Sequence, residues 1–376
     1  MNALQRSLFS IAGAALVAAS LACSTEPAFA AARRRSVTPG GPRHVSGINA
    51  TVQFAPQPVR GKGAQQLAWE VILRNDSDRE ITIETIEVLR GGSDRLFANY
   101  NGPALRPSII NLPPRPANSP RPQERIGARE GAVILFLVAQ PSLDDIPPLL
   151  EHRFRFTDGT VVRGVMTSVN LAPPPVLSAP LRGGNWRAWN GLGSDSLHRR
   201  AGAMVDGRST FAQRFAIDWA RVDASGKTYS GDRRRNTSYY AYGMDVLAPA
   251  DGVVTIVKDG LPDNIPQLPP VVPITLETLT GNYVVIDIGN NQFAVAAHLK
   301  PGSIAVRAGD RVTKGMRLAQ LGNSGNSSEP HLHFHLCDAS SNVGCEGLPY
   351  VLDHFSTPTG PRQLELPMKD EVVDFH

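Results

Sequence analysis

A mainly all-β fold of two domains is predicted by three features of this sequence. Its 376 residues exceed the usual size of a single domain. Between residues 48 and 172, short segments alternate apolar and polar residues with the period of two that half-buried strands show. Beyond residue 185, apolar segments of strand length are again separated by tight turns. We therefore expect an immunoglobulin-like β-sandwich followed by a domain built on an antiparallel β-sheet.

Residues 1–30 have the features of a secretory signal peptide. An apolar run at 8–19 is too short to span a membrane, and Ala28-Phe29-Ala30 has the small-x-small pattern of a cleavage site. We expect export to the periplasm, the cell envelope or the extracellular space, without a transmembrane anchor. The alternative is a lipid anchor at Cys23, which is less favoured because Ser20 stands where lipoprotein sites have an aliphatic residue.

Residues 31–47 are basic and rich in glycine and proline, which predicts a flexible leader. The β-sandwich is expected over residues 48–172, where Asp158-Gly159 is a hairpin signal between two strands. His44 and His152 stand alone in this part of the chain, so we expect solvated or structural roles for both. Because it contains no motif for chemistry, the sandwich is interpreted as an accessory domain.

The proline-rich residues 173–184 are expected to form a semi-rigid linker. The second domain is predicted over residues 185–356, followed by a C-terminal tail at 357–376. Two insertions interrupt its strand pattern, at 221–242 and 259–280, and we expect these long loops to wall a substrate groove. The strands of this domain are expected at residues 252–257, 282–288, 293–299, 312, 318–321 and 331–336.

The last of these strands, His-Leu-His-Phe-His-Leu, places three of the nine histidines at every second position. On a strand, this period puts His331, His333 and His335 on one face. Imidazole is the commonest zinc ligand in proteins, so this face predicts a metal site. A surface strand with solvated histidines is the alternative. The metal is favoured by His298 at the end of an apolar strand and by Asp218 in an apolar segment, since a buried carboxylate needs a partner.

Two cysteines remain after cleavage at Ala30, Cys337 and Cys345, with seven residues between them. An isolated close pair in an oxidising compartment favours a disulfide. A metal site is less favoured, because no other cysteine is present to complete a thiolate set. We expect the bridge to pin the segment that leaves the histidine strand.

Five ordered motifs between residues 195 and 355 resemble those of the lysostaphin-type (LytM-like) zinc metallopeptidases, which cut peptide cross-bridges in bacterial peptidoglycan. The resemblance implies the family's antiparallel β fold, one zinc ion per chain, and peptidoglycan peptide as the substrate. It also implies hydrolysis of a peptide bond by metal-activated water. The motifs are Ile217-Asp218, the segment 246–254, Ala297-His298-Leu299, the segment 309–315 and His331-Leu332-His333-Phe334.

The resemblance implies Asp218 and His333 as two of the three metal ligands. The family's remaining ligand is a histidine four residues before the aspartate, but Arg214 stands there, and a guanidinium cation cannot bind a metal. His198 is the nearby upstream histidine without another role, so we predict a site of His198, Asp218 and His333. Without His198 the site is expected to be metal-poor and inactive. A surface histidine beside two arginines is the alternative for His198.

His298 and His331 match the family's two histidines that do not bind the metal, and we predict that both are catalytic. An imidazole with a pKa near ~6.5 suits a group that orients water, takes its proton or stabilises an oxyanion. His335 stands where the family commonly has an acidic or amide residue. We expect it to support a ligand or to be a residue of the strand face, since a fourth protein ligand would close the site.

Two functions of different classes follow. The first is an exported zinc metalloendopeptidase that hydrolyses peptide cross-links of peptidoglycan. The second is a catalytically inactive relative that binds cell-wall peptide or activates another hydrolase. The enzyme is favoured, because only one of the family's site positions is displaced. A net charge of +4 is a small excess for binding an anionic wall polymer, and no motif indicates nucleic-acid binding or an oligomeric state.

Overall fold

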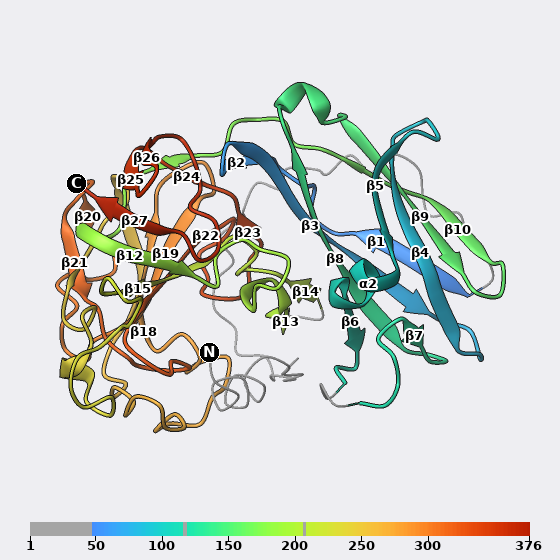
Figure 1. The fold of residues 1–376 in the computed structure, drawn as a ribbon. Coiled ribbons are helices and arrows are strands. Elements are labelled where there is room, and N and C mark those ends of the chain that lie inside the picture. Colours follow the sequence, from blue (N-terminus) through green and yellow to red (C-terminus); the bar gives the residue numbers. More distant parts are fainter. Residues whose placement is uncertain (1–46, 116–118, 206–207) are drawn as a thin grey trace.

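A computed structural model describes residues 47–115, 119–205 and 208–376, which fold into two β structures packed side by side (Figure 1). The expected signal peptide, Cys23, the leader up to residue 46 and His44 lie outside the described residues. Among the described residues, no helix is both long and apolar enough to cross a membrane. The prediction of a mainly antiparallel β fold is confirmed.

The N-terminal part is a sandwich of two five-stranded antiparallel sheets. One sheet has the order β1-β3-β8-β6 with β2 paired to β3, and the other has the order β10-β9-β4-β5 with β7 paired to β4. The immunoglobulin-like type of this sandwich stays a prediction. Its elements are β1 (Ile48–Val52), β2 (Val59–Gly61), β3 (Ala64–Asn75), β4 (Ile81–Arg90), β5 (Leu96–Asn101), α2 (Gly102–Leu105), η1 (Arg106–Ser108), β6 (Ile109–Leu112), β7 (Arg125–Ile126), β8 (Gly131–Gln140), η2 (Leu143–Asp145), β9 (Leu149–Phe156) and β10 (Val161–Ser168).

The core of the sandwich contains one buried histidine. Trp69 of β3 stacks on Phe136 of β8 with 4.8 Å between the ring centroids. The indole N–H of Trp69 donates to Nε2 of His152 at 2.9 Å, and Nδ1–H of His152 donates to the carbonyl of Val165 at 2.8 Å. Both contacts are satisfied by the neutral imidazole, whereas a second ring proton would face the indole N–H. The structural role expected for His152 agrees with this environment.

The C-terminal part is built on an eleven-stranded sheet with the order β20-β17-β18-β19-β22-β15-β12-β27-β25-β26, and β23 paired to β22. The histidine strand β22 lies between β19 and β15 in the middle of this order. The elements are β11 (Val176–Leu177), β12 (Gly183–Trp189), η3 (His198–Arg200), β13 (Ala203–Val205), β14 (Arg208–Thr210), β15 (Ile217–Arg221), η4 (Asn236–Ser238), β16 (Asp245–Leu247), β17 (Gly252–Lys258), β18 (Asn282–Asp287), β19 (Phe293–Leu299), β20 (Arg311–Val312), β21 (Arg317–Gln320), β22 (Leu332–Cys337), β23 (Gly347–Leu348), β24 (Val351–Leu352), β25 (Phe355–Thr357), β26 (Gly360–Arg362) and β27 (Val372–Phe375).

Two segments expected outside the second domain contribute strands to its sheet. β12 begins inside the expected linker at 173–184, and β27 lies inside the expected tail at 357–376. These strands pair with each other, with Trp186 opposite Val373, and both side chains are buried in the main core. The segment 357–376 is therefore an integral part of the sheet. β27 has only four residues, which is too short for a clear alternating pattern in the sequence.

The predicted disulfide between Cys337 and Cys345 is present, with the two Cα atoms 5.8 Å apart. Cys337 is the last residue of β22, and Cys345 stands two residues before β23, which pairs with β22. The bridge therefore ties the segment that leaves the histidine strand back to that strand.

The two parts of the chain share an apolar contact at β2 and β3. Val59 and Ala68 of the sandwich are buried in the same cluster as Leu366 and Met368. The backbone N–H of Leu366 donates to the carbonyl of Arg60 at 2.8 Å. This contact places the sandwich directly against the C-terminal β structure.

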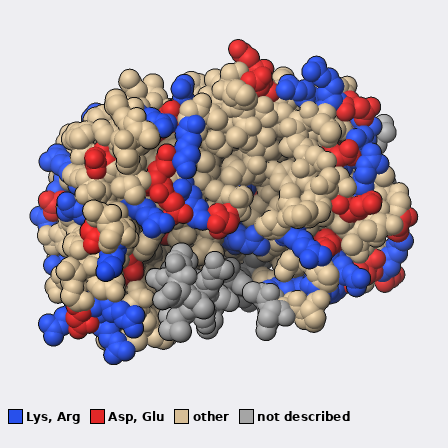
Figure 2. All heavy atoms as spheres, viewed as in Figure 1, with Lys and Arg blue, Asp and Glu red and all other residues tan. Residues whose placement is uncertain are grey.

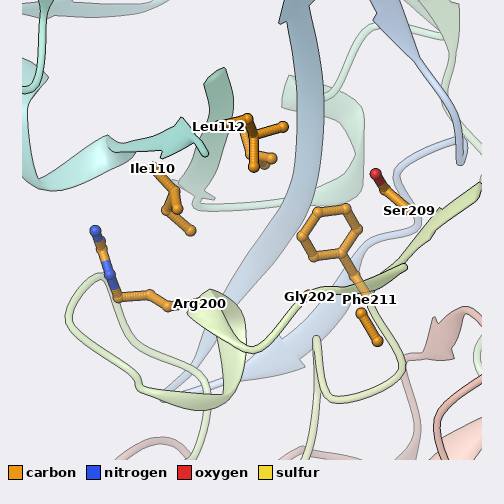
Figure 3. A pocket seen from close by; sticks show the side chains of 8 residues that line it. Ile110, Leu112, Arg200, Gly202, Ser209 and Phe211 are labelled. Carbon is orange, nitrogen blue, oxygen red and sulfur yellow. The ribbon is translucent and has the colours of Figure 1, made fainter. Parts of the chain in front are cut away.

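A further contact involves Phe211, which packs against Val133 and Leu135 of β8. Beside it is a cavity of about 10 Å³, shown in Figure 3. That volume holds at most about one water molecule, so the cavity is too small for a substrate. It is lined by Ile110, Leu112, Val133, Arg200, Gly202, Ala203, Ser209 and Phe211.

His152 provides a test through the pH dependence of stability. Burial lowers its pKa to about 4, against about 6.5 in an unfolded chain. As the pH falls from 6.5 to 4, the unfolded chain binds a proton that the folded chain does not, which destabilises the fold by about 3 kcal/mol. His152→Gln keeps an acceptor for Trp69 and a donor for Val165 but cannot titrate. Urea unfolding at pH 7 and pH 4 should show a smaller loss of stability for this variant, and equal losses would contradict the assignment.

Candidate metal centre

The register of three neighbouring strands brings the central side chains together. Asp218 on β15 pairs directly with His333 on β22. On the other side of β22, His333 pairs with Ala297, the residue before His298 on β19. The strand order β19-β22-β15 therefore places the aspartate and two histidines from separate parts of the sequence around one point.

His198 reaches this point from outside the sheet. It is the first residue of η3, is only 9% exposed, and has its Nε2 3.2 Å from Oδ2 of Asp218. Its Nδ1 lies 3.0 Å from the carbonyl oxygen of Asn190 and 3.2 Å from that of Ala216. Because carbonyls only accept hydrogen bonds, Nδ1 carries a proton, and Nε2 is the ring nitrogen that faces Asp218. The alternative of a surface histidine does not describe this buried ring.

The three residues predicted as ligands lie next to one another in the structure. Donor atoms of His198, Asp218 and His333 all lie within 4.8 Å of one another, and all three side chains are buried. Nδ1 of His333 is 2.9 Å from Oδ1 of Asp218. Among the described residues, no lysine or arginine forms an ion pair with this carboxylate. Two imidazole nitrogens and one carboxylate oxygen fit a zinc ion with an open position.

The charge of Asp218 is stabilised by its surroundings. Burial alone would raise its pKa, but His198 and His331 outweigh burial and hold the pKa of Asp218 well below its usual range. The side-chain amide of Asn190 donates to Oδ2 at 2.8 Å. Asn190 thus contacts Asp218 through its side chain and His198 through its carbonyl. Sequence reasoning missed this residue, for which the turn signal Asn190-Gly191 is the only indication.

His298 and His331 present their Nε2 atoms in the same way. Nδ1 of His298 lies 2.8 Å from the carbonyl oxygen of Ser324, and Nδ1 of His331 lies 2.8 Å from that of Glu329. In both rings Nδ1–H is therefore the donor, and Nε2 is the nitrogen that points toward the centre of the site. The two rings are neighbours, with centroids 4.8 Å apart.

The two histidines differ in their proton affinity. Burial, together with the neighbouring His331 and His333, lowers the pKa of His298 well below its usual range. Burial also opposes protonation of His331, but the Asp218 carboxylate, 3.4 Å from its Nε2, outweighs burial and raises the pKa of His331. The pair therefore combines an imidazole that stays neutral with one that holds a proton more readily.

His298 also has an unusual backbone conformation, with φ at 60°. For a residue with a Cβ this left-handed conformation is uncommon, and such residues concentrate at functional sites. The Ser324 carbonyl that accepts from its ring packs against Gly281, where an added Cβ would clash with that oxygen. The glycine allows the loop at 322–328 to approach His298 closely.

His335 lies behind His333, with its Nδ1 2.9 Å from Nε2 of His333. It therefore contacts the ring nitrogen of His333 that does not face Asp218. This position agrees with the expectation that His335 supports a ligand. His335 also lies close to Cys337 and Cys345, whose sulfur atoms are joined in the disulfide and so do not form a thiolate site.

The two insertions are tied to the loop that precedes the histidine strand. Asn236 in the first insertion donates to the carbonyl of Asn264 in the second at 2.8 Å. Asn264 donates in turn to the carbonyls of Gly325 and Ser327, at 2.7 and 2.8 Å. The insertions are thus held beside the residues that orient His298 and His331. That they wall a substrate groove stays a prediction.

Residues 237–344 match Peptidase family M23. The matched segment contains His298, His331 and His333, whereas His198 and Asp218 precede it. Over 94 residues the chain is 34% identical to the peptidoglycan DD-endopeptidase ShyA of Vibrio cholerae. That match covers 25% of this chain and 17% of ShyA, so the chain aligns with only a small part of this relative.

Two solved catalytic domains are also similar. That of lysostaphin from Staphylococcus simulans is 18% identical, with 44% of this chain and 88% of the other covered and a TM-score of 0.23. That of the M23 protein EnpA from Enterococcus faecalis is 19% identical, with 48% and 92% covered and a TM-score of 0.24.

The ring orientations can be tested in the metal-free protein. Nitrogen-15 NMR spectra at neutral pH should show a proton on Nδ1 of both His198 and His298, because backbone carbonyls accept from Nδ1 in both. The exposed His376, whose ring contacts the Ser356 hydroxyl, serves as the control, and its ring protons should exchange with solvent more readily. A His198 ring without a proton on Nδ1 would contradict this orientation.

Proposed function

We propose that this chain is a zinc metalloendopeptidase. The proposal starts from the match of residues 237–344 to Peptidase family M23 and from motifs that resemble those of the lysostaphin-type enzymes. Its substrate is proposed to be the peptide part of bacterial peptidoglycan. The name of ShyA, a peptidoglycan DD-endopeptidase, supports this substrate class.

The observation that supports an enzyme best is the position of His198. At the family's first ligand position the chain has Arg214, which would leave Asp218 and His333 as an incomplete set. The Nε2 atom of His198 lies beside the carboxylate of Asp218 and makes up the missing donor. An inactive binding protein, the alternative function, would have no need of a replacement donor.

The proposed ligands are His198, Asp218 and His333. A zinc ion bound there would supply a Lewis acid that polarises the scissile carbonyl and lowers the pKa of water. Both proposed histidine ligands are held in place through their second ring nitrogen. The carbonyl of Asn190 contacts Nδ1 of His198, and His335 contacts Nε2 of His333.

His298 and His331 are proposed to move protons. His298, with its lowered pKa, is neutral, takes a proton from the attacking water at Nε2, and passes it to the leaving amine when the C–N bond breaks. His331, with its raised pKa, donates a hydrogen bond from Nε2 to the carbonyl oxygen on which negative charge develops. Their Nδ1 contacts with Ser324 and Glu329 keep both rings oriented during this exchange.

A location in the cell envelope or outside the cell is proposed for the mature chain. The expected signal peptide and a peptidoglycan substrate both support it, and the disulfide is the kind of bond that persists in oxidising compartments. On the face shown in Figure 2, acidic and basic side chains are interspersed, so long-range attraction to an anionic polymer has no single focus there.

The enzyme and the binding protein differ in two measurable properties. The purified mature chain should contain about one zinc ion per molecule and should release new amino groups from peptidoglycan, with loss of activity on chelation and recovery with zinc. Stoichiometric binding to peptidoglycan without zinc and without new amino groups would favour the inactive relative.

Single substitutions should separate ligands from proton-transfer residues. His333→Ala and Asp218→Ala should lose zinc, because each removes one of three donors. His298→Ala and His331→Ala should retain zinc while hydrolysis falls by about 10²–10⁴-fold, the usual contribution of a general acid or base. Zinc content and initial rates should be measured on the same folded samples. Full zinc in the His333 variant would show that the two groups of histidines are interchanged.

A further inference from the structure

We propose that the β-sandwich is a structural part of the metal centre, because it positions His198 through the two arginines that follow it. The inference rests on the proposed function, in which His198 is a metal ligand. It makes Arg199 and Arg200 positioning residues and gives the sandwich a role in catalysis.

The segment that carries His198 has little structure of its own. η3 is a single turn of three residues in the connection between β12 and β13, and within the part of the chain that the structure describes β13 pairs with β14 alone. His198 is therefore outside the eleven-stranded sheet that fixes Asp218 and His333. A loop residue needs contacts from elsewhere to hold a ring nitrogen beside a carboxylate.

Arg199 attaches this turn to the core of the sandwich. Its side chain is 2% exposed, and one of its terminal nitrogens donates to the carbonyl of Phe136 at 2.8 Å and to that of Trp69 at 3.3 Å. The same nitrogen is 3.6 Å from a carboxylate oxygen of Glu70. Trp69 and Phe136 are the stacked pair of the sandwich core, so the turn is attached to buried strands of that unit.

Arg200 makes a second attachment on the same side of the turn. It donates to the carbonyl of Pro107 in η1 at 2.7 Å and to that of Ile109, the first residue of β6, at 3.2 Å. Two consecutive residues next to His198 thus bind carbonyls of three separate segments of the sandwich. Four backbone carbonyls fix the turn more narrowly than one ion pair on a flexible side chain would.

Arg214, which stands at the family's first ligand position, belongs to the same network of contacts. Its guanidinium donates to Glu70 at 2.7 Å, to the carbonyl of Gly347 at 2.8 Å and to Glu346 at 2.6 Å. Glu346 follows Cys345 of the disulfide that ends at β22. The side chain at position 214 therefore joins the sandwich to the segment behind the histidine strand, and Glu70 contacts both Arg199 and Arg214.

Arg200→Gln is the primary variant, because Arg200 is partly exposed and its loss should leave the chain folded. Arg199→Lys keeps the buried positive charge but loses the geometry of the guanidinium. The matched control is Arg60→Gln, which removes an ion pair with Glu365 at the other contact between the two parts of the chain. Zinc affinity should be measured by competition with a chelator on the full mature chain, together with the fraction folded.

The expected result is a loss of zinc affinity of about 10–100-fold in Arg200→Gln and Arg199→Lys, the usual effect of removing a group that orients a ligand. Arg60→Gln should bind zinc like the unmodified chain. A readout without metal is the Nδ1–H resonance of His198, which should broaden or shift in both arginine variants while that of His298 stays unchanged.

Two results would overturn the inference in different ways. If both arginine variants bind zinc like the unmodified chain while His198→Ala loses affinity, the sandwich does not position the ligand, and the proposed function stands. If His198→Ala binds zinc like the unmodified chain, the ligand assignment is wrong and the inference fails with it.

Discussion

The burial of the Asp218 carboxylate is the constraint on which the rest of the site depends. An ionised carboxylate away from water costs several kcal/mol unless donors or cations surround it. This chain surrounds it with nitrogen atoms of His198, His331, His333 and Asn190. Of these, the ring nitrogens of His198 and His333 are also the proposed metal donors, and that of His331 is proposed to act on the substrate. Groups that stabilise the buried carboxylate at the centre of the sheet are therefore also the ones proposed for the chemistry.

A second buried charge cluster lies behind the first and is built on arginine. Glu70, Arg199, Arg214 and Glu346 are buried or nearly so, and removing one member of such a group typically costs about 3–5 kcal/mol because the others stay buried without a partner. In the sequence, Arg199 of this cluster directly follows His198, and Arg214 stands four residues before Asp218. It explains why an arginine at position 214 is compatible with a metal site: its side chain is committed to Glu70 and Glu346, away from Asp218.

The orientation of the histidines depends on backbone carbonyls more than on other side chains. Those of Asn190, Ser324 and Glu329 accept from Nδ1 of His198, His298 and His331 in turn. All three belong to loops: Ser324 lies in the loop at 322–328 that the insertions hold in place, and Glu329 directly follows that loop. Precise ring placement in this site is thus a property of loop conformation, while the strands supply the approximate positions.

The alternation of residues along single strands was enough to predict the β fold and the shared face of the histidines in β22, because strand geometry acts over neighbouring positions. The prediction of Asp218 and His298 as site residues came from their apolar surroundings and from the resemblance of their motifs to a known family. The isolated cysteine pair was enough to predict its disulfide. Only the tertiary structure decided that His198 and Asn190 lie beside Asp218, that Arg199 and Arg214 reach Glu70, and that the last strand, β27, pairs with β12. These contacts join loops or distant segments through packing of the whole chain, and no local periodicity encodes them.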